Sequence, residues 1–406
     1  MNAATPRLEY SLDIARGLAA LWVFLFHLAP MIEISAPALA SFATIGSNGV
    51  LLFFVVSGYC IHASAARLTN GGMRGVGTFL RRRMRRIYPP FWLSLLVVLA
   101  LPYVVAAISM LKSGAFEWPE RAAWSDWDLF DWLGLLTLTR GLATGESGDS
   151  AFNAVQAVYW TLAIEVQFYL VVALAMCAGR RWRIVLWAVT LAAALVVVFR
   201  IHVPGGTFVQ FWPHFAFGMV LHVMHEHEAT LPGDGRLLTL ILACSGLLLI
   251  AIGIHLVGRP LAYAFSLTCA AVLWLSGHIE DWIRKHWGSG GQHRALRIAG
   301  RSVMTLPLLL GASSYSVYLL HGKLYQVPAM FVRQVVPPDS VFHALFVIVL
   351  TCALCYLFYL FAERPFIRTS TTARLVESNA MSPSAAPPSY PGAFTTAPTE
   401  YVQKEN

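Results

Sequence analysis

Residues 12–32 read LDIARGLAALWVFLFHLAPMI, a stretch that is apolar except at Asp13, Arg16 and His27. A helix needs about 20 mostly apolar residues to cross the ~30 Å hydrocarbon core of a bilayer. At about 100° and ~1.5 Å per residue, Arg16 and His27 lie about 20° apart around such a helix and about 16 Å apart along it. Asp13 lies about 40° from His27 in the same projection. The stretch therefore predicts a membrane-spanning helix with one polar stripe.

The composition of the whole chain excludes a soluble globular protein. Its 406 residues are 57% hydrophobic and 12% charged, with a mean hydropathy of +0.62. Soluble domains carry about 25% charged residues, and a soluble fold could not bury this much apolar surface. We therefore predict an all-α integral membrane protein. Its ten expected transmembrane helices lie at approximately 12–32, 45–66, 87–111, 156–178, 183–201, 208–226, 236–256, 260–279, 306–330 and 341–362.

The distribution of Lys and Arg predicts the orientation of these spans. If the N-terminus is cytoplasmic, 21 of the 29 basic residues fall in inner connections and tails, and six fall in outer connections. Cytoplasmic loops carry such an excess, so both termini are expected in the cytoplasm and the protein in the inner, or plasma, membrane. Because the basic residues sit in these connections, the net charge of +8 does not indicate nucleic acid as a partner.

The composition changes at the C-terminal end. From Thr369 to Asn406, 22 of the 38 residues are Ser, Thr, Pro or Ala. Such a segment has too few large apolar groups to fold. We expect a membrane domain at 1–368, followed by a disordered cytoplasmic tail at 369–406.

The sequence gives no good metal site. His222, His225 and His227 lie close together, but the sixth span leaves the membrane there, and spacing alone is a poor indication of a metal. Cys352 and Cys355 stand in an apolar run, where cysteine usually packs as a small apolar residue. We therefore expect no metal.

Several ionisable side chains fall inside predicted spans, where each costs several kcal/mol unless it is paired or hydrated. Glu165 and His321 lie about nine residues from the outer ends of their spans, at a depth similar to that of His27. Ser314 and Tyr318 share a helix face with His321. A single polar chamber in the outer half of the membrane would explain these residues, and pairing between two of them is the alternative.

Five arginines occupy six positions in the segment 81–86, after the glycine-rich stretch 71–77. The positive-inside rule explains some of them. Guanidinium groups three positions apart, such as Arg83 and Arg86, share a helix face and bind phosphate in a bidentate manner. The segment therefore indicates a polyphosphate ligand in the cytosol, with anionic lipid as the alternative. For Ser57-Gly58, close helix packing is favoured over a nucleophilic Ser57.

These residues resemble, in order along the chain, the motifs of the membrane-bound acyltransferase 3 family. The family transfers acyl groups, commonly acetyl, to carbohydrates and related acceptors. The similar segments are Leu12-Asp13 with Arg16-Gly17 and the Arg-x10-His spacing to His27, Phe53-Phe54-Val55-x-Ser57-Gly58, Arg83-x-x-Arg86 before Ile87-Tyr88-Pro89, Trp160-x-Leu162-x-x-Glu165, Ser314-x-x-x-Tyr318-Leu319-x-His321 and Glu363-Arg364-Pro365-Phe366.

The resemblance implies an enzyme that moves an acyl group across the membrane from cytosolic acetyl-CoA. On this hypothesis His27 and Glu165 are catalytic, with His27 as the general base on the acceptor hydroxyl. The residues expected to bind the donor are Arg16, Arg83, Arg86 and Ser57, and the other polar residues of the chamber are Asp13, Trp160, Ser314, Tyr318 and His321. Asp13 is expected to orient Arg16.

The expected acceptor is a hydroxyl of an exported polysaccharide, a glycolipid or a lipid-linked oligosaccharide. The expected partners are acyl-CoA, this acceptor, the lipid bilayer and the machinery of polysaccharide assembly. A covalent acyl-enzyme on His27 or Ser57 remains an alternative to direct transfer. Intramembrane His and Glu also serve proton relays, so a proton-coupled exporter of a glycolipid or small metabolite is the alternative function, and a non-catalytic scaffold is a third.

Overall fold

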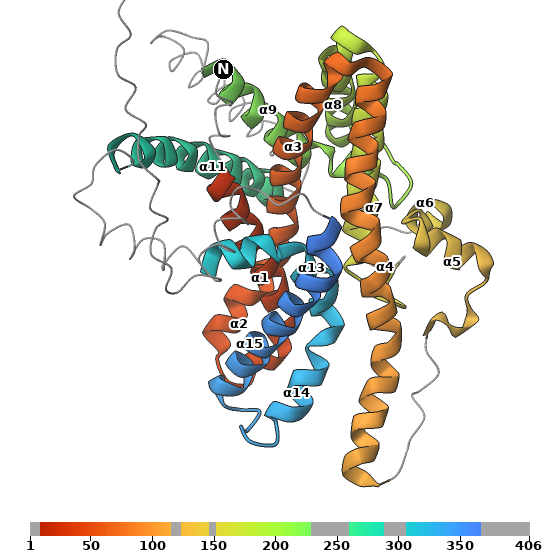
Figure 1. Cartoon of the computed structure of the whole chain (residues 1–406), viewed down its shortest axis with the longest axis vertical. Helices are drawn as coiled ribbons and strands as arrows, with labels where there is room; N and C mark the ends of the chain where they lie inside the picture. The colour runs from red at the N-terminus through yellow and green to blue at the C-terminus, as the bar shows by residue number, and fades with distance from the viewer. Residues whose placement is uncertain (1–8, 115–122, 146–151, 229–259, 288–305, 367–406) are drawn as a thin grey trace, which may run out of the picture.

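The computed structural model describes residues 9–114, 123–145, 152–228, 260–287 and 306–366, and within these ranges the chain is helical and contains no strand. Most of the long helices run along the long axis of the molecule, and α11 lies across them (Figure 1). The α-helices are α1 (Glu9–Glu33), α2 (Pro37–Thr44), α3 (Gly49–Leu68), α4 (Gly72–Ser113), α5 (Leu129–Leu136), α6 (Arg140–Thr144), α7 (Tyr159–Met176), α8 (Trp182–Val198), α9 (Trp212–Glu228), α11 (Pro260–Trp287), α13 (Ser314–Leu324), α14 (Gln326–Val332) and α15 (Val341–Phe358).

Six segments of the described chain are long and apolar enough to cross a membrane. They are Tyr10–Glu33, Pro37–Leu111, Tyr159–Met176, Gly179–Val198, Leu261–Glu280 and Val341–Phe366. The predicted spans 45–66 and 87–111 both fall in the second segment, which contains α2, α3 and α4. The predicted span 236–256 and the predicted tail 369–406 lie outside the described residues. The all-helical membrane class is confirmed, while the number of ten spans and the orientation stay predictions.

The predicted span 306–330 is divided in the structure. A first helical stretch covers 306–312, a turn follows at Ser313, and α13 and α14 meet at Tyr325. Their interruption leaves Ser314, Tyr318 and His321 on a short helix that packs against α1, α4 and α15. Irregular backbone at membrane depth is tolerated where protein covers it, so the break is compatible with a membrane-embedded position.

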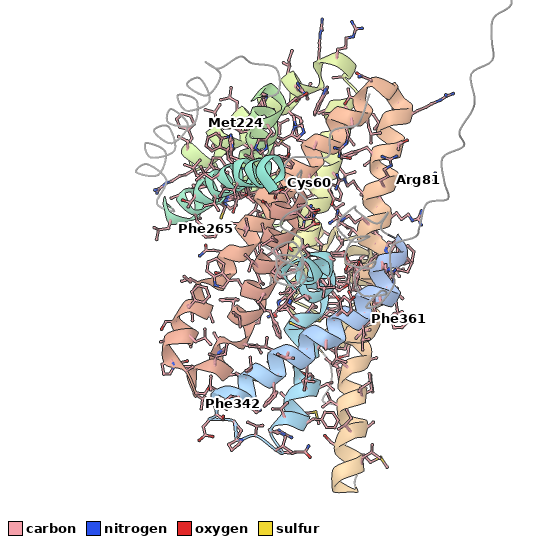
Figure 2. The ribbon with its side chains drawn as sticks, turned by 60° about the vertical axis from the view of Figure 1, so that its left-hand side comes forward. Cys60, Arg81, Met224, Phe265, Phe342 and Phe361 are labelled. Carbon is pink, nitrogen blue, oxygen red and sulfur yellow. The ribbon has the colours of Figure 1, made fainter. Side chains whose placement is uncertain are left out.

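The outer surface of the bundle is apolar in the way lipid requires. Leu96, Leu174 and Phe361 expose 64%, 71% and 79% of their surfaces. Figure 2 labels Phe342 at the start of α15 and Phe361 in the turn that follows this helix. Exposed apolar surface on this scale is unfavourable in water and favourable in hydrocarbon.

Glycines set the closest contact between helices, that of α3 with α9. A Cβ at Gly58 would collide with the backbone carbonyl of Phe215, and one at Gly218 with the carbonyl of Val55. Small residues permit such an approach between membrane helices. The packing interpretation of Ser57-Gly58 is therefore confirmed for Gly58.

The arginine cluster lies on a helix rather than in a connection. Helix α4 begins at Gly72, runs through the five arginines and continues past Pro89, Pro90 and Pro102. Arginine is a good helix former, and prolines are tolerated in membrane helices when neighbouring groups satisfy the freed carbonyls. The helix of 42 residues thus carries the arginines directly into the bundle.

Candidate functional site

A cavity lies where α1, α3, α4, α7 and α13 meet, and we call it the central cavity. It comprises about 620 Å³ of space between atoms, part of it open to the surroundings. Two guanidinium groups and one carboxylate are among its lining groups, so it is polar at membrane depth. Its lining residues are Arg16, Val50, Phe53, Phe54, Ser57, Arg86, Ile87, Thr161, Leu162, Glu165, Ser314, Tyr315 and Tyr318.

The Glu165 carboxylate is held by two hydroxyl groups. Tyr169 donates a hydrogen bond of 2.6 Å to Glu165 Oε1 from the next turn of α7, and Ser57 donates one of 3.3 Å from α3. Arg16 and Arg83 interact electrostatically with the same carboxylate. The Glu165 side chain is thus fixed in position on the cavity wall by donors from two helices.

Arg16 is anchored on the opposite side of the cavity. Its Nη1 forms an ion pair of 2.9 Å with Asp13, one turn earlier on α1, and its Nη2 donates to the Cys60 thiol at 2.9 Å. Both charged side chains expose only 17% of their surface. Asp13 therefore lies beside Arg16, where the sequence placed it, and does not line the cavity.

The five arginines at positions 81–86 of α4 divide into two groups. Arg81, Arg82 and Arg85 are exposed, and Figure 2 shows Arg81 on the outward side of the helix. Arg83 and Arg86 are partly buried, three positions apart on the face that the bundle covers. Of the exposed three, Arg85 donates to the carbonyl oxygen of Pro365 at 3.5 Å, while the inner two lie on the side of the site.

The two inner arginines differ in their surroundings. Arg86 lines the central cavity. Arg83 donates to the carbonyl oxygen of Cys60 at 3.0 Å, and its guanidinium lies 5.5 Å from the centre of the Tyr169 ring. Cys60 thus accepts from both Arg16 and Arg83, which places the three cationic side chains around one corner of the cavity.

Helix α13 forms the wall opposite α7. The Tyr318 and Thr161 hydroxyls lie 2.7 Å apart and bridge the two helices, and Tyr315 donates to the carbonyl of Ile87 at 3.0 Å. Ser314 also lines the cavity. These contacts fix the position of α13 relative to α4 and α7 and thereby the width of the cavity.

A buried carboxyl group also binds α13. Glu363, 2% exposed, accepts hydrogen bonds from the backbone N–H of Ser316 at 3.1 Å and from its hydroxyl at 2.5 Å. Glu363 ends a π-helical turn, Tyr359–Glu363, that follows α15. Such turns are frequent at functional sites. The carboxyl group also interacts electrostatically with Arg86 and Arg16.

His27 and His321 form a pair outside the lining of the central cavity. Their ring centres are 5.0 Å apart, and the His321 ring lies 5.7 Å from that of Tyr318, which does line the cavity. The structure thus separates the two histidines from Glu165, although the sequence placed the three at similar depth. Tyr318 is the residue that contacts both groups.

Trp160 lies on the other face of α7. It lines a second, uncharged cavity with Phe152, Phe211 and the loop Pro204–Thr207, and its ring stacks near those of Phe54 and Phe211. Gln167 holds this loop by donating to the carbonyl of Gly206 and accepting from the N–H of Phe208. Phe54, which packs against the Trp160 ring, and Thr161, the next residue in the chain, both line the central cavity.

Three residues beside the candidate site were given no role from the sequence, although Glu363 stands in one of the family-like segments. Tyr169 follows Glu165 by four residues, a spacing that places both on one helix face, so this signal was available. Tyr315 had only its position beside Ser314 to indicate a role. Glu363 stands 47 positions from Ser316, and no local pattern predicts that contact.

The histidines at the far ends of α3 and α9 form a separate cluster. His62 Nδ1 and His222 Nδ1 lie 2.9 Å apart, and the His62 ring packs against Trp182. Among the described residues, no three His, Cys, Asp or Glu side chains are grouped so as to hold a metal ion. The contacts of His62 and His222 are those of packed, hydrogen-bonded side chains.

Comparison with known families accounts for this arrangement. The family model of the acyltransferase domain Acyl_transf_3 matches residues 9–360. The chain belongs to the acyltransferase 3 family. No curated protein and no solved structure matches it. The match includes every helix that lines the central cavity, so the polar groups gathered there are those of a membrane acyltransferase.

Proposed function

We propose that this acyltransferase 3 protein moves an acetyl or similarly short acyl group from cytosolic acyl-CoA to a hydroxyl of an exported polysaccharide, glycolipid or lipid-linked oligosaccharide. The observation that supports the proposal best is the central cavity, where Arg16 and Arg86 meet Ser57 and Glu165 within membrane-embedded helices. A cavity of this charge suits a ligand that carries phosphates on a long neutral arm.

In this proposal the arginines bind the phosphates of the acyl-CoA donor. Guanidinium groups bind phosphate oxygens with two parallel hydrogen bonds. Arg86 follows the exposed arginines of α4 by less than two helical turns, and so it is the first cationic side chain that a nucleotide meets on entering the cavity from that end. Arg83 binds the backbone of Cys60, whose thiol accepts from Arg16, and so helps to fix the position of Arg16. The acyl end of the donor then extends toward Ser57 and Tyr318.

His27 supplies the base in this mechanism. A neutral imidazole takes a proton from the acceptor hydroxyl, and the oxygen attacks the thioester carbonyl. The carbon–sulfur bond breaks, the acyl group remains on the acceptor oxygen, and the proton passes to the departing CoA thiolate. Glu165 orients Arg16 and the Ser57 hydroxyl, which donates toward the carboxylate.

The decisive experiment combines cells and purified protein. Mass spectrometry of surface glycans with and without the chain should reveal a species that loses one acyl-sized mass when the chain is absent. Purified protein in lipid nanodiscs should release free CoA thiol from acetyl-CoA when that glycan is added. A glycan profile that does not change, together with no thiol release, would exclude the proposed transfer.

The same assay separates the enzyme from its rivals. An exporter moves its cargo without consuming a thioester, and a scaffold tolerates loss of the buried polar residues. His27→Ala protein that inserts normally but releases no thiol supports catalysis by His27. Full thiol release from this variant would remove His27 from the chemistry.

A further inference from the structure

The His321 ring is held in one tautomer. It is fully buried, and its Nδ1 lies 3.0 Å from the carbonyl oxygen of Val317, one turn earlier on α13. A carbonyl oxygen only accepts hydrogen bonds, so Nδ1 carries the hydrogen. In a neutral imidazole the other nitrogen is then an acceptor with a free lone pair. His321 therefore presents a basic Nε2 on the side of the ring away from the α13 backbone.

This basic nitrogen has no hydrogen-bond partner. His321 Nε2 is among the few buried side-chain atoms of the described residues that lack one. An acceptor that is removed from water without compensation costs free energy, and such groups are rare in folded proteins. A lone pair in this state is available to take a proton from a neighbouring group.

The neighbours of His321 identify the group that can give it a proton. Three rings lie around it, those of His27 at 5.0 Å, Phe24 at 5.6 Å and Tyr318 at 5.7 Å. Phe24 cannot ionise, and the Tyr318 hydroxyl is engaged with Thr161 on α7. His27 on α1 is thus the neighbouring ring that can pass a proton to His321.

The charged groups of the neighbouring elements are engaged elsewhere. Glu363, which follows α15, bonds Ser316, and Glu165 on α7 bonds Ser57 and Tyr169. Arg86 of α4 lines the central cavity. His27 interacts electrostatically with His321, whereas Glu363, Glu165 and Arg86 are not among the groups that do so.

We propose that His321 is the proton-accepting partner of His27 in acyl transfer, an inference that rests on the proposed function. As one nitrogen of His27 takes the acceptor hydroxyl proton, the proton on its other nitrogen passes to His321 Nε2. The hydroxyl O–H bond breaks, one N–H bond forms and one breaks on His27, and one forms on His321. His321 then carries the positive charge, which the hydrogen bond from its Nδ1 to the Val317 carbonyl oxygen stabilises. The proton returns through His27 to the CoA thiolate, which restores both rings.

The test asks whether acyl transfer needs a basic side chain at position 321 or only a side chain of similar volume. His321→Gln keeps a donor for Val317 and a similar volume but supplies no base. In nanodiscs we expect its kcat for acetyl transfer to fall at least 100-fold, with the KM for acetyl-CoA unchanged. His343→Gln is the matched control, because His343 is also buried with ring nitrogens that lack partners, and its kcat should stay within threefold of wild type.

Chemical rescue decides between a base and a packing residue. His321→Ala creates space for a small ring, and added imidazole should raise its rate at least tenfold, whereas pyrazole, a ring of the same shape and much weaker basicity, should not. Equal rescue by both rings, no rescue by either, or a His321→Gln kcat within threefold of wild type would overturn the inference. If wild type transfers no acyl group, the proposed function fails instead.

Discussion

At the scale of single residues, the site separates arginines that look alike in the sequence. Arg86 lines the central cavity, and Arg81 stands five positions earlier on the exposed face of α4. Both carry the same charge on the same helix. Only a residue that lines the cavity is in a position to bind the phosphates of a donor. Comparing variants of Arg86 and Arg81 therefore separates phosphate binding from the general effect of positive charge on α4.

Arg86→Ala should raise the KM for acetyl-CoA about tenfold or more, because a charge-assisted bond to phosphate is worth about 1.5–3 kcal/mol. Arg81→Ala should leave KM unchanged. Initial rates of thiol release in nanodiscs measure both. Equal effects from the two variants would assign the whole cluster to membrane orientation and lipid binding.

Glu165 makes a second residue-scale prediction. Glu165→Gln removes the charge that faces Arg16 and Arg83 while it keeps an acceptor for Tyr169. Two buried cations then lack part of their compensation, and acyl transfer should fall about 100-fold or more. The matched control is Glu226→Gln, since Glu226 pairs with Arg183 at the surface, where such pairs contribute about 0–1 kcal/mol. Wild-type rates from Glu165→Gln would show that its charge is dispensable.

At the scale of helices, packing between α3 and α9 determines where Ser57 lies. Gly58 has no room for a Cβ, because the Phe215 carbonyl occupies that space, whereas nothing lies within 4 Å of a Cβ at Gly77 on α4. Gly58→Ala should destabilise the protein by about 1–3 kcal/mol. Gly77→Ala should be neutral or stabilising by about 0.5–1 kcal/mol.

Thermal unfolding of the two purified variants in detergent measures this difference. A lower Tm for Gly58→Ala alone is expected, together with reduced acyl transfer, because Ser57 moves with its neighbour. The same Tm for both variants would mean that α3 and α9 are further apart in the membrane than the structure places them.

At the scale of the whole molecule, the orientation predicted from Lys and Arg has a direct test. Cys177 is exposed beside the basic segment Gly179–Arg181, at the end of α7 that should face the cytoplasm. With the other five cysteines replaced by alanine, a membrane-impermeant maleimide should label Cys177 only after the membrane is permeabilised. Adding Ala143→Cys in α6, at the other side, should give labelling in intact cells. The reverse pattern would invert the proposed route of the acyl group.

Some of the candidate site was within reach of the sequence and some was not. Arg16, Ser57, Glu165, Ser314 and Tyr318 were chosen within predicted spans and Arg86 in the cytosolic segment 81–86, and all six line one cavity. Arg83, Asp13 and Trp160 lie beside it on other partners.

The sequence by itself determined that this is a helical membrane protein of the acyltransferase 3 family. Hydrophobic length, charge content and the order of short motifs are properties of the chain, and they need no knowledge of which helix touches which. Helical periodicity likewise determined that Asp13 and Arg16 would meet, since a contact three residues apart is local.

Only the tertiary structure decided how the polar groups divide. The position of each residue along its helix predicted a similar depth for His27, Glu165 and His321. The rotation of each helix about its axis and the order of the helices in the bundle then separate them. Glu165 lies with the arginines, and the two histidines lie together next to the Tyr318 ring. The contact between Glu363 and Ser316 is of the same kind. Such contacts depend on how glycine-lined helix surfaces pack, which is a property of pairs of helices and is not encoded in the pattern of any one of them.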